Sequence, residues 1–195
     1  CDAEQLFIAA TTDEVVDGRS QIRVVRVLAG QQGMVVTELP TLPFVPEVSH
    51  ATVRFDHAEI DMSDILPGDG YSGYVKLFRT IEDIHVSTAI LGYVARTAIF
   101  YHWSRHLVEQ ILALIISHRQ LGLMDPRCSM THLALAGARQ QMEVLLENVD
   151  AEWKKTDKNG YECWLRDKAL LKIAGKAGSQ RRDNAWASID SRQRY

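Results

Sequence analysis

Two histidines four residues apart, His102 and His106, have the spacing with which one continuous helix can hold a metal ion. Ser104 lies between them, and serine is a residue type that favours helix starts, so the sequence predicts a helix break here. No carboxylate or cysteine completes a ligand set around the two histidines. We therefore predict no metal site.

Glu82 and His85 are three residues apart, so on a helix both can face one cleft and share a hydrogen bond. A carboxylate and an imidazole are the common proton-transfer groups of enzymes. The alternative is that Glu82 and Asp83 form an ordinary acidic first turn, which the helix dipole favours. In that case His85 is a buried or solvated helix residue, and the sequence leaves both interpretations open.

Charge and cysteine content exclude several classes of protein. A net charge of −3 gives no general attraction to nucleic acid or to an anionic membrane, so neither partner is predicted. Arg181 and Arg182 are expected on a solvated helix face rather than on a bound phosphate. Cys1, Cys128 and Cys163 are odd in number and widely separated, which favours a reducing cytoplasm over a disulfide framework.

The most apolar run, residues 107–116, is interrupted by polar residues and is far shorter than the roughly 20 residues that span a bilayer. No transmembrane helix is predicted. The chain begins at Cys1 and enters a strand-like pattern almost at once. This beginning leads us to expect a native amino terminus further upstream.

Residues 6–55 are predicted to form strands. Short runs of β-branched and aromatic residues occur at 6–8, 22–27, 34–36 and 52–55, separated by turn residues. Asp17 and Gly18 predict a tight hairpin turn. Pro40, Pro43 and Pro46 predict an irregular connection between the third and fourth strands, because proline cannot donate to a central ladder.

After the Pro-Gly-Asp-Gly sequence at residues 67–70, the apolar residues take helical spacing. Helices are predicted from about Tyr74, from Ser104 to Leu121 with Gly122 as a stop, from 129 to 154, and from 162 to 189. A polar loop is expected at 156–160. One stripe of the first helix is expected to contain Ile81, Ile84, Thr88, Leu91 and Ala95.

These patterns predict an α+β fold class. A partial antiparallel β-domain is expected over residues 1–70, followed by a four-helix up-down bundle over residues 71–195. The boundary between them is placed between Leu66 and Tyr74.

Four segments, in order along the chain, resemble the acyl-CoA dehydrogenase family. Ala-Ala-Thr-Thr-Asp at 9–13 is similar to a strand of the family's middle β-domain, and residues 53–66, which begin Val-Arg-Phe-Asp, are similar to the end of that domain. The glycine-rich residues 66–74 resemble the turn before the first carboxy-terminal helix. Ala-Ile-Leu-Gly at 89–92 resembles the small-residue stretch of that helix.

The resemblance implies an acyl-CoA dehydrogenase C-terminal-like arrangement, with the family's amino-terminal domain absent. It also implies FAD, held with the help of residues upstream of Cys1 and of a second subunit. The partners it implies are an acyl-CoA substrate and further copies of the chain, which associate through the helical bundle.

The family removes an α-proton of the thioester with a glutamate, and burial beside an apolar acyl chain suits a carboxylate to this step. The Tyr-Glu-Gly segment that carries the base in most members is not present in this sequence. In the isovaleryl and long-chain members the base is on the first bundle helix, and the matching position here is Glu82, ten residues before Gly92. The resemblance therefore implies Glu82 as the catalytic base.

Arg105 falls near the place of a family arginine that contacts the FAD pyrophosphate, although the Phe-Gly that follows the family's arginine is missing here. The resemblance thus implies Arg105 as a cofactor-binding residue. The predicted function is part of a flavin-dependent oxidoreductase that acts on the CH–CH group of an acyl-CoA thioester. The alternative is a non-catalytic relative that serves as a structural, oligomerising or acyl-CoA-binding protein.

Overall fold

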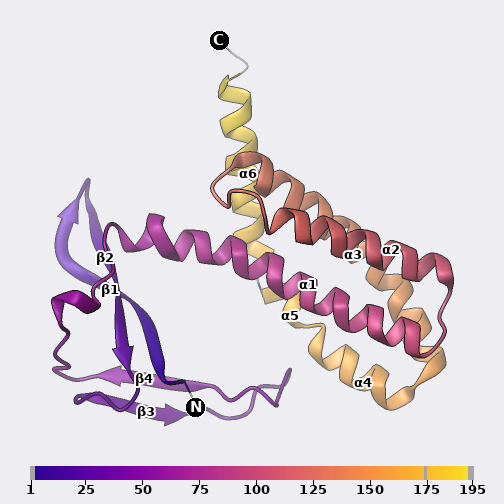
Figure 1. Ribbon diagram of the computed structural model, residues 1–195, viewed down its shortest axis with the longest axis horizontal. Helices are drawn as coiled ribbons and strands as arrows, with labels where there is room; N and C mark the ends of the chain where they lie inside the picture. The colour runs from indigo at the N-terminus through magenta and orange to yellow at the C-terminus, as the bar shows by residue number, and fades with distance from the viewer. Residues whose placement is uncertain (1–2, 174, 193–195) are drawn as a thin grey trace. The chain divides into compact units, whose positions relative to one another are not determined.

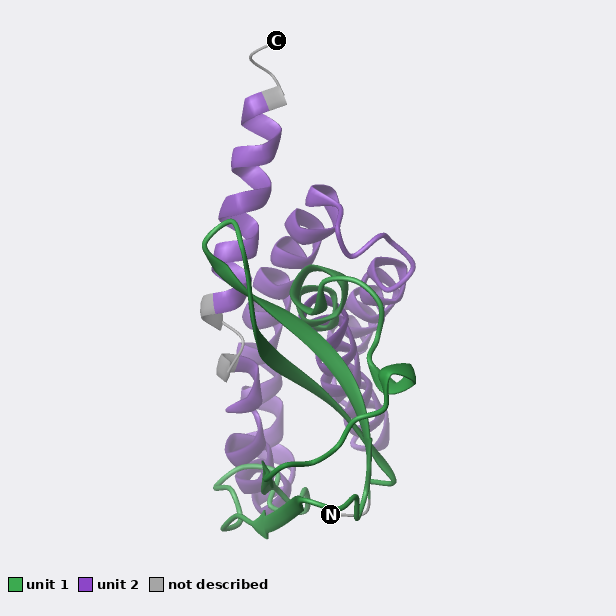
Figure 2. Ribbon diagram, turned by 90° about the vertical axis from the view of Figure 1, so that its left-hand side faces the viewer, with its two compact units in different colours: residues 1–78 green, residues 79–195 purple. Residues whose placement is uncertain are grey.

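In the computed structural model, which describes residues 3–173 and 175–192, the chain divides into two units, Cys1–Phe78 and Arg79–Tyr195 (Figure 2). Cys1 itself lies outside the described residues. Strands make up the regular structure of most of the first unit, and helices make up the second (Figure 1). The predicted α+β class, with small antiparallel sheets before a helical part, is confirmed.

Strands β1 (Gln5–Val16) and β2 (Arg19–Leu28) form an antiparallel hairpin. Asp17 and Gly18 connect them with φ angles of 51° and 75°. Two consecutive positive φ values belong to the type I′ turn, whose twist matches that of the paired strands. The predicted hairpin turn is therefore confirmed, and β1 extends well beyond the predicted run at residues 6–8.

Strands β3 (Met34–Glu38) and β4 (Ala51–Phe55) pair antiparallel in a separate sheet. The three prolines lie in the irregular connection between them, as predicted. A short 3-10 helix, Met62–Asp64, then returns the chain to β2, where Arg26 pairs with Asp64 at 2.6 Å.

Two positions in the glycine-rich turn at residues 66–74 require glycine because of their backbone geometry. Gly68 has a φ of 83°, and a Cβ on Gly70 would lie 2.7 Å from the Ile22 carbonyl oxygen. Only glycine accommodates both conditions without strain. A single π-helical turn, Tyr71–Val75, follows and runs directly into the first long helix.

Four residues separate the end of helix α1 (Lys76–Phe100) from the start of α2 (Arg105–Leu121). The Ser104 hydroxyl accepts a hydrogen bond from the Leu107 amide at 3.3 Å, and Gly122 follows the last turn. The predicted cap and stop of this helix are confirmed. Helix α3 (Ser129–Thr156) also begins where the sequence predicts.

The single fourth helix predicted over 162–189 is wrong. The chain leaves the helix after Asp167, the last residue of α4 (Lys158–Asp167), and the described helical residues beyond the break are α5 (Leu170–Ile173) and α6 (Gly175–Arg192). The predicted polar loop is also shorter, because Asp157 caps α4 by accepting from the Asn159 amide at 3.1 Å. Beyond α4, the Arg139 side chain of α3 donates a hydrogen bond to the Leu171 carbonyl of α5 at 3.2 Å. A backbone acceptor after the break is thus satisfied by a side chain from another helix.

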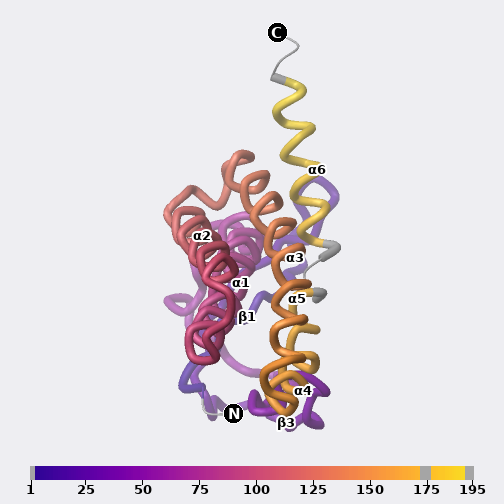
Figure 3. The backbone as a smooth tube through the Cα atoms, turned by 90° about the vertical axis from the view of Figure 1, so that its right-hand side faces the viewer, coloured from indigo at the N-terminus to yellow at the C-terminus, as the bar shows by residue number. Residues whose placement is uncertain are grey.

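The core of the second unit lies among α1, α2, α3 and α4. It contains Leu91 and Val94 of α1, Ile111 of α2, Val149 of α3 and Trp164 of α4, all almost completely buried. Both α4 and α6 pack along α3, and Figure 3 shows α3 flanked by α2 and α6. Within residues 3–173 and 175–192, no helix combines the length and apolarity needed to cross a membrane.

The buried stripe of α1 is shifted slightly from the predicted one. Ile84, Leu91 and Ala95 are buried as expected for a core face, but Ile81 is 42% exposed. Asp83, which the sequence treats as part of an acidic turn, is buried instead. One helix face therefore carries both the apolar core residues and a carboxylate.

Candidate functional site

Glu82 lies on α1 with its side chain 38% exposed. Its carboxylate is 3.5 Å from Nη1 of Arg79, one turn earlier on the same helix. Glu82 is not in the first turn of α1, which has no acidic residue. Its position therefore owes little to the helix dipole, whose effect is confined to the first turn.

His85 does not form the hydrogen bond with Glu82 that their spacing in the sequence allows. Its side chain is exposed on α1. Across the described parts of the chain, the hydrogen bonds and ion pairs of Glu82 include Arg79 but not His85. A carboxylate–imidazole pair at this place is therefore not formed.

Asp83 is the neighbour of Glu82 but lies on the buried face of α1. It is 7% exposed and forms ion pairs with Arg139 of α3, at 3.5 Å, and with Arg181 of α6. Both arginine side chains are also largely buried. The expectation that Arg181 lies on a solvated helix face is wrong, because Asp83 holds its guanidinium inside the bundle.

Sequence reasoning missed this three-helix ion cluster, although one signal was present. Asp83 lies three residues after Thr80 and four before Ser87, and all three polar residues are buried on α1. That spacing marks one face of a helix. A charge on a face shared with core residues requires a buried partner of opposite charge.

Arg105 is the first residue of α2 and is exposed. It borders a hollow of about 500 Å³ at the turn between α1 and α2, together with His102, Trp103 and Glu109. Free backbone amides and the helix dipole make a helix start attractive to anions, and an arginine adds a full positive charge. These features suit an anionic group at the rim of the hollow, although Glu109, one turn further along α2, adds a negative charge there.

The two histidines considered for a metal do not share a helix. His102 lies between α1 and α2 with a φ of 54°, and His106 is in the first turn of α2. The predicted helix break is thus confirmed. Among the residues with described positions, three or more metal-ligating side chains do not gather at any point.

His118 is a titratable group buried in the middle of the bundle. Its ring is fully buried on α2, with Nδ1 2.9 Å from the Leu114 carbonyl, and Nε2 has no partner among the residues that the structure describes. Burial lowers the pKa of the imidazole, the Leu114 hydrogen bond opposes this, and the nearby Arg139 charge lowers it further. The folded chain therefore keeps His118 neutral.

The lowered pKa of His118 predicts a pH-dependent stability. The unfolded chain takes up a proton on this residue below about pH 6.5 while the folded chain resists it, so stability is present above that pH and is lost as the pH falls. The slope from this one proton is up to about 1.4 kcal/mol per pH unit. Urea unfolding at several pH values should show a shallower dependence in His118→Gln.

The matched control for that experiment is His106→Gln, because His106 is exposed on the same helix. This variant should keep the slope of the parent chain. If both variants keep it, the burial of His118 does not govern stability in this pH range.

Comparison by sequence finds no matching family model and no matching curated protein. Comparison by structure finds butyryl-CoA dehydrogenase from Megasphaera elsdenii, with a TM-score of 0.69 at 12% identity over 95% of this chain. An acyl-CoA dehydrogenase from Slackia heliotrinireducens gives a TM-score of 0.60 at 14% identity over 98% of it.

The FMN-bound form of TdsC, a dibenzothiophene monooxygenase from Paenibacillus sp. A11-2, gives a TM-score of 0.69 at 13% identity over 96% of this chain. The matches cover only 56%, 58% and 60%, respectively, of the three solved chains. Similarity at these identities establishes an acyl-CoA dehydrogenase-like fold for the chain.

Proposed function

We propose that this chain, which has an acyl-CoA dehydrogenase-like fold, is part of a flavin-dependent oxidoreductase acting on the CH–CH group of an acyl-CoA thioester. The proposal rests on the extent of the structural similarity to solved flavin enzymes. It runs through the strand unit and the helical unit alike, and it includes solved acyl-CoA dehydrogenases.

In this proposal Glu82 is the catalytic base that removes the α-proton. Its carboxylate is accessible on α1, with Arg79 of the same helix at 3.5 Å. An acyl chain lying against this part of α1 would exclude water from the carboxylate. The exposed Phe78 and Ile81 on the same helix would supply apolar contacts for such a chain.

Arg105 is the proposed cofactor-binding residue. Its guanidinium at the start of α2 would hold a phosphate of FAD by charge-assisted hydrogen bonds. When bound, the flavin would supply the acceptor for the β-hydride. Residues outside this chain and a second subunit are proposed to complete the binding of the isoalloxazine ring.

We propose that copies of the chain associate through the helical unit. Several large apolar side chains are exposed on three of its helices, among them Phe100 at 72%, Ile116 at 68% and Val144 at 65%. Burying such side chains between subunits is favourable. Cytoplasmic location stays a prediction from the cysteine pattern.

The second candidate function is a non-catalytic relative that retains the fold for assembly or acyl-CoA binding. Two observations favour it. Glu82 is partly exposed and already paired with Arg79. Arg105 shares the hollow with the carboxylate of Glu109, one turn further along α2, and lacks the Phe-Gly of the family's flavin-binding arginine.

Visible spectroscopy of the full-length protein purified from cells separates these functions. The proposed oxidoreductase should carry flavin whose absorbance bleaches when an acyl-CoA is added without oxygen. A colourless protein that takes up no flavin on reconstitution contradicts the proposal and supports the non-catalytic function. A bound flavin that no acyl-CoA bleaches contradicts the acyl-CoA activity while leaving the flavin-dependent fold in place.

A further inference from the structure

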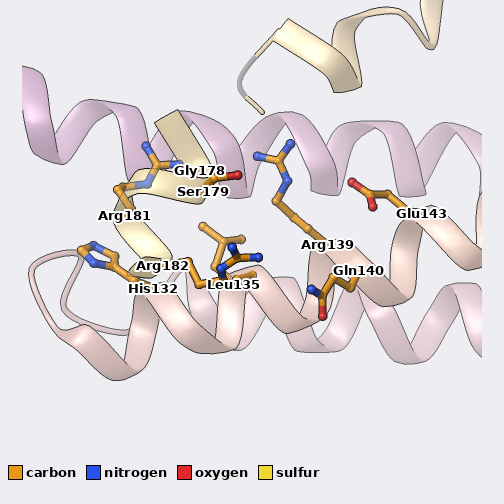
Figure 4. Close-up of a pocket in the computed structure, with 10 residues that line it drawn as sticks. His132, Leu135, Arg139, Gln140, Glu143, Gly178, Ser179, Arg181 and Arg182 are labelled. Carbon is orange, nitrogen blue, oxygen red and sulfur yellow. The ribbon is translucent and has the colours of Figure 1, made fainter. Parts of the chain in front are cut away.

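A pocket of about 220 Å³ lies in the helical unit. Its lining residues fall between His132 and Arg182 and include neither Glu82 nor Arg105. Helix α3 contributes Arg139 and Glu143, and helix α6 contributes Ser179, Arg181 and Arg182 (Figure 4). Three guanidinium groups from two different helices thus share one concave surface. Neither candidate site residue of the proposed oxidoreductase lines it.

The three arginines differ in how firmly they are held. Asp83 pairs with Arg139 and Arg181, and Glu143 lines the pocket. Arg182 pairs with Asp183 at 3.1 Å, so three carboxylates accompany the three arginines, but both side chains of this last pair are well exposed, and such surface pairs contribute little. The Arg182 guanidinium can therefore turn to a ligand at little energetic cost.

Two of the arginines are fixed before any ligand arrives. Arg139 and Arg181 are 18% and 14% exposed, and Asp83 holds one nitrogen of each. Arg139 is held further by the Leu171 carbonyl. A guanidinium has five N–H donors, so each keeps further donors beyond these contacts. Groups that are already ordered bind a ligand with little additional loss of entropy.

We infer that this pocket binds a phosphate group. A phosphate is small enough for the cavity, and its oxygens accept the paired N–H bonds that arginine offers in a fixed geometry. The inference is independent of the proposed function, because it uses neither flavin nor acyl-CoA. The phosphate can be inorganic or part of a larger molecule whose remainder extends into solvent.

Calorimetric titration of the full chain with inorganic phosphate tests the inference. The parent chain should bind, and Arg182→Gln should weaken binding about tenfold, as expected for the loss of one charge-assisted contact. Arg119→Gln removes an equal charge from an exposed position on α2 and should leave binding unchanged. Equal weakening in both variants overturns the inference. So does a parent chain that binds neither inorganic phosphate nor adenosine monophosphate, the second ligand titrated.

A second pair of variants predicts a change in the opposite direction. Glu143→Gln removes the carboxylate that lines the pocket and should strengthen phosphate binding several-fold. Glu147→Gln, one turn further along α3 and outside the pocket, should not. If Glu143→Gln leaves phosphate affinity unchanged, the anion is bound elsewhere and the inference is wrong.

Adenosine monophosphate identifies the source of the phosphate in the same titration. Equal affinity for the nucleotide and for inorganic phosphate supports a pocket that recognises the phosphate alone. Tighter binding of the nucleotide, still weakened by Arg182→Gln, supports a nucleotide-borne phosphate. Nucleotide binding that Arg182→Gln does not alter places the ligand outside this pocket and contradicts the inference.

Discussion

Replacing Asp83 with asparagine is expected to lower the unfolding free energy by about 3 kcal/mol. The carboxylate is 7% exposed and balances the charges of Arg139 and Arg181, which come from two other helices. Without it, two largely buried guanidinium groups face each other with no negative charge between them. Urea denaturation monitored by circular dichroism measures the loss directly.

The control is the neighbouring residue. Glu82→Gln changes the same charge one position earlier, but its carboxylate is partly exposed and has a single surface partner, so its effect on stability should stay within about 0.5 kcal/mol. A second test is the double variant Asp83→Asn with Arg181→Met, which should recover part of the lost stability by removing one unpaired charge. Similar small losses for Asp83→Asn and Glu82→Gln contradict the cluster's role.

Most helix and strand starts followed from residues close together in the sequence. The Asp17–Gly18 turn depends on two adjacent residues that tolerate positive φ. The start of α2 depends on Ser104 and an amide three residues away. Local hydrogen bonding and backbone preference decide such features, so the sequence alone predicts them.

The features that sequence reasoning missed depend on distant residues. Arg181 and Asp83 are 98 positions apart in the chain. The predicted fourth helix is interrupted after Asp167, and Leu171 just beyond the interruption accepts a hydrogen bond from Arg139, 32 residues away. Helical periodicity reports which face a residue occupies but not which distant partner lies against it.

The family resemblance predicted both the fold and the roles of individual residues. Four short segments, read in order, predicted the acyl-CoA dehydrogenase-like fold, and the structural likeness confirms the fold. The roles of Glu82 and Arg105 stay predictions, because each depends on atoms of a substrate or cofactor rather than on the chain. A fold supports many reactions, and specific side chains decide which one occurs.

Glu82→Gln is expected to lower the rate of acyl-CoA oxidation by about 10²- to 10⁴-fold, the usual contribution of a general base. Glutamine has nearly the same shape but cannot accept the α-proton. Because the side chain is on the helix surface, the fold should be retained, and flavin should stay bound. Single-turnover bleaching of the flavin by an acyl-CoA measures the proton-abstraction step without product release.

Two comparisons make the Glu82 result specific. Glu147→Gln removes an exposed carboxylate of α3 and should keep the parent rate, which excludes a general effect of charge. Raising the pH should not rescue Glu82→Gln, since the amide has no proton-accepting form to gain. A variant that bleaches at the parent rate removes Glu82 from the mechanism. Because Asp83 is buried against two arginines, it would be a poor replacement, and the base would then have to come from another part of the protein.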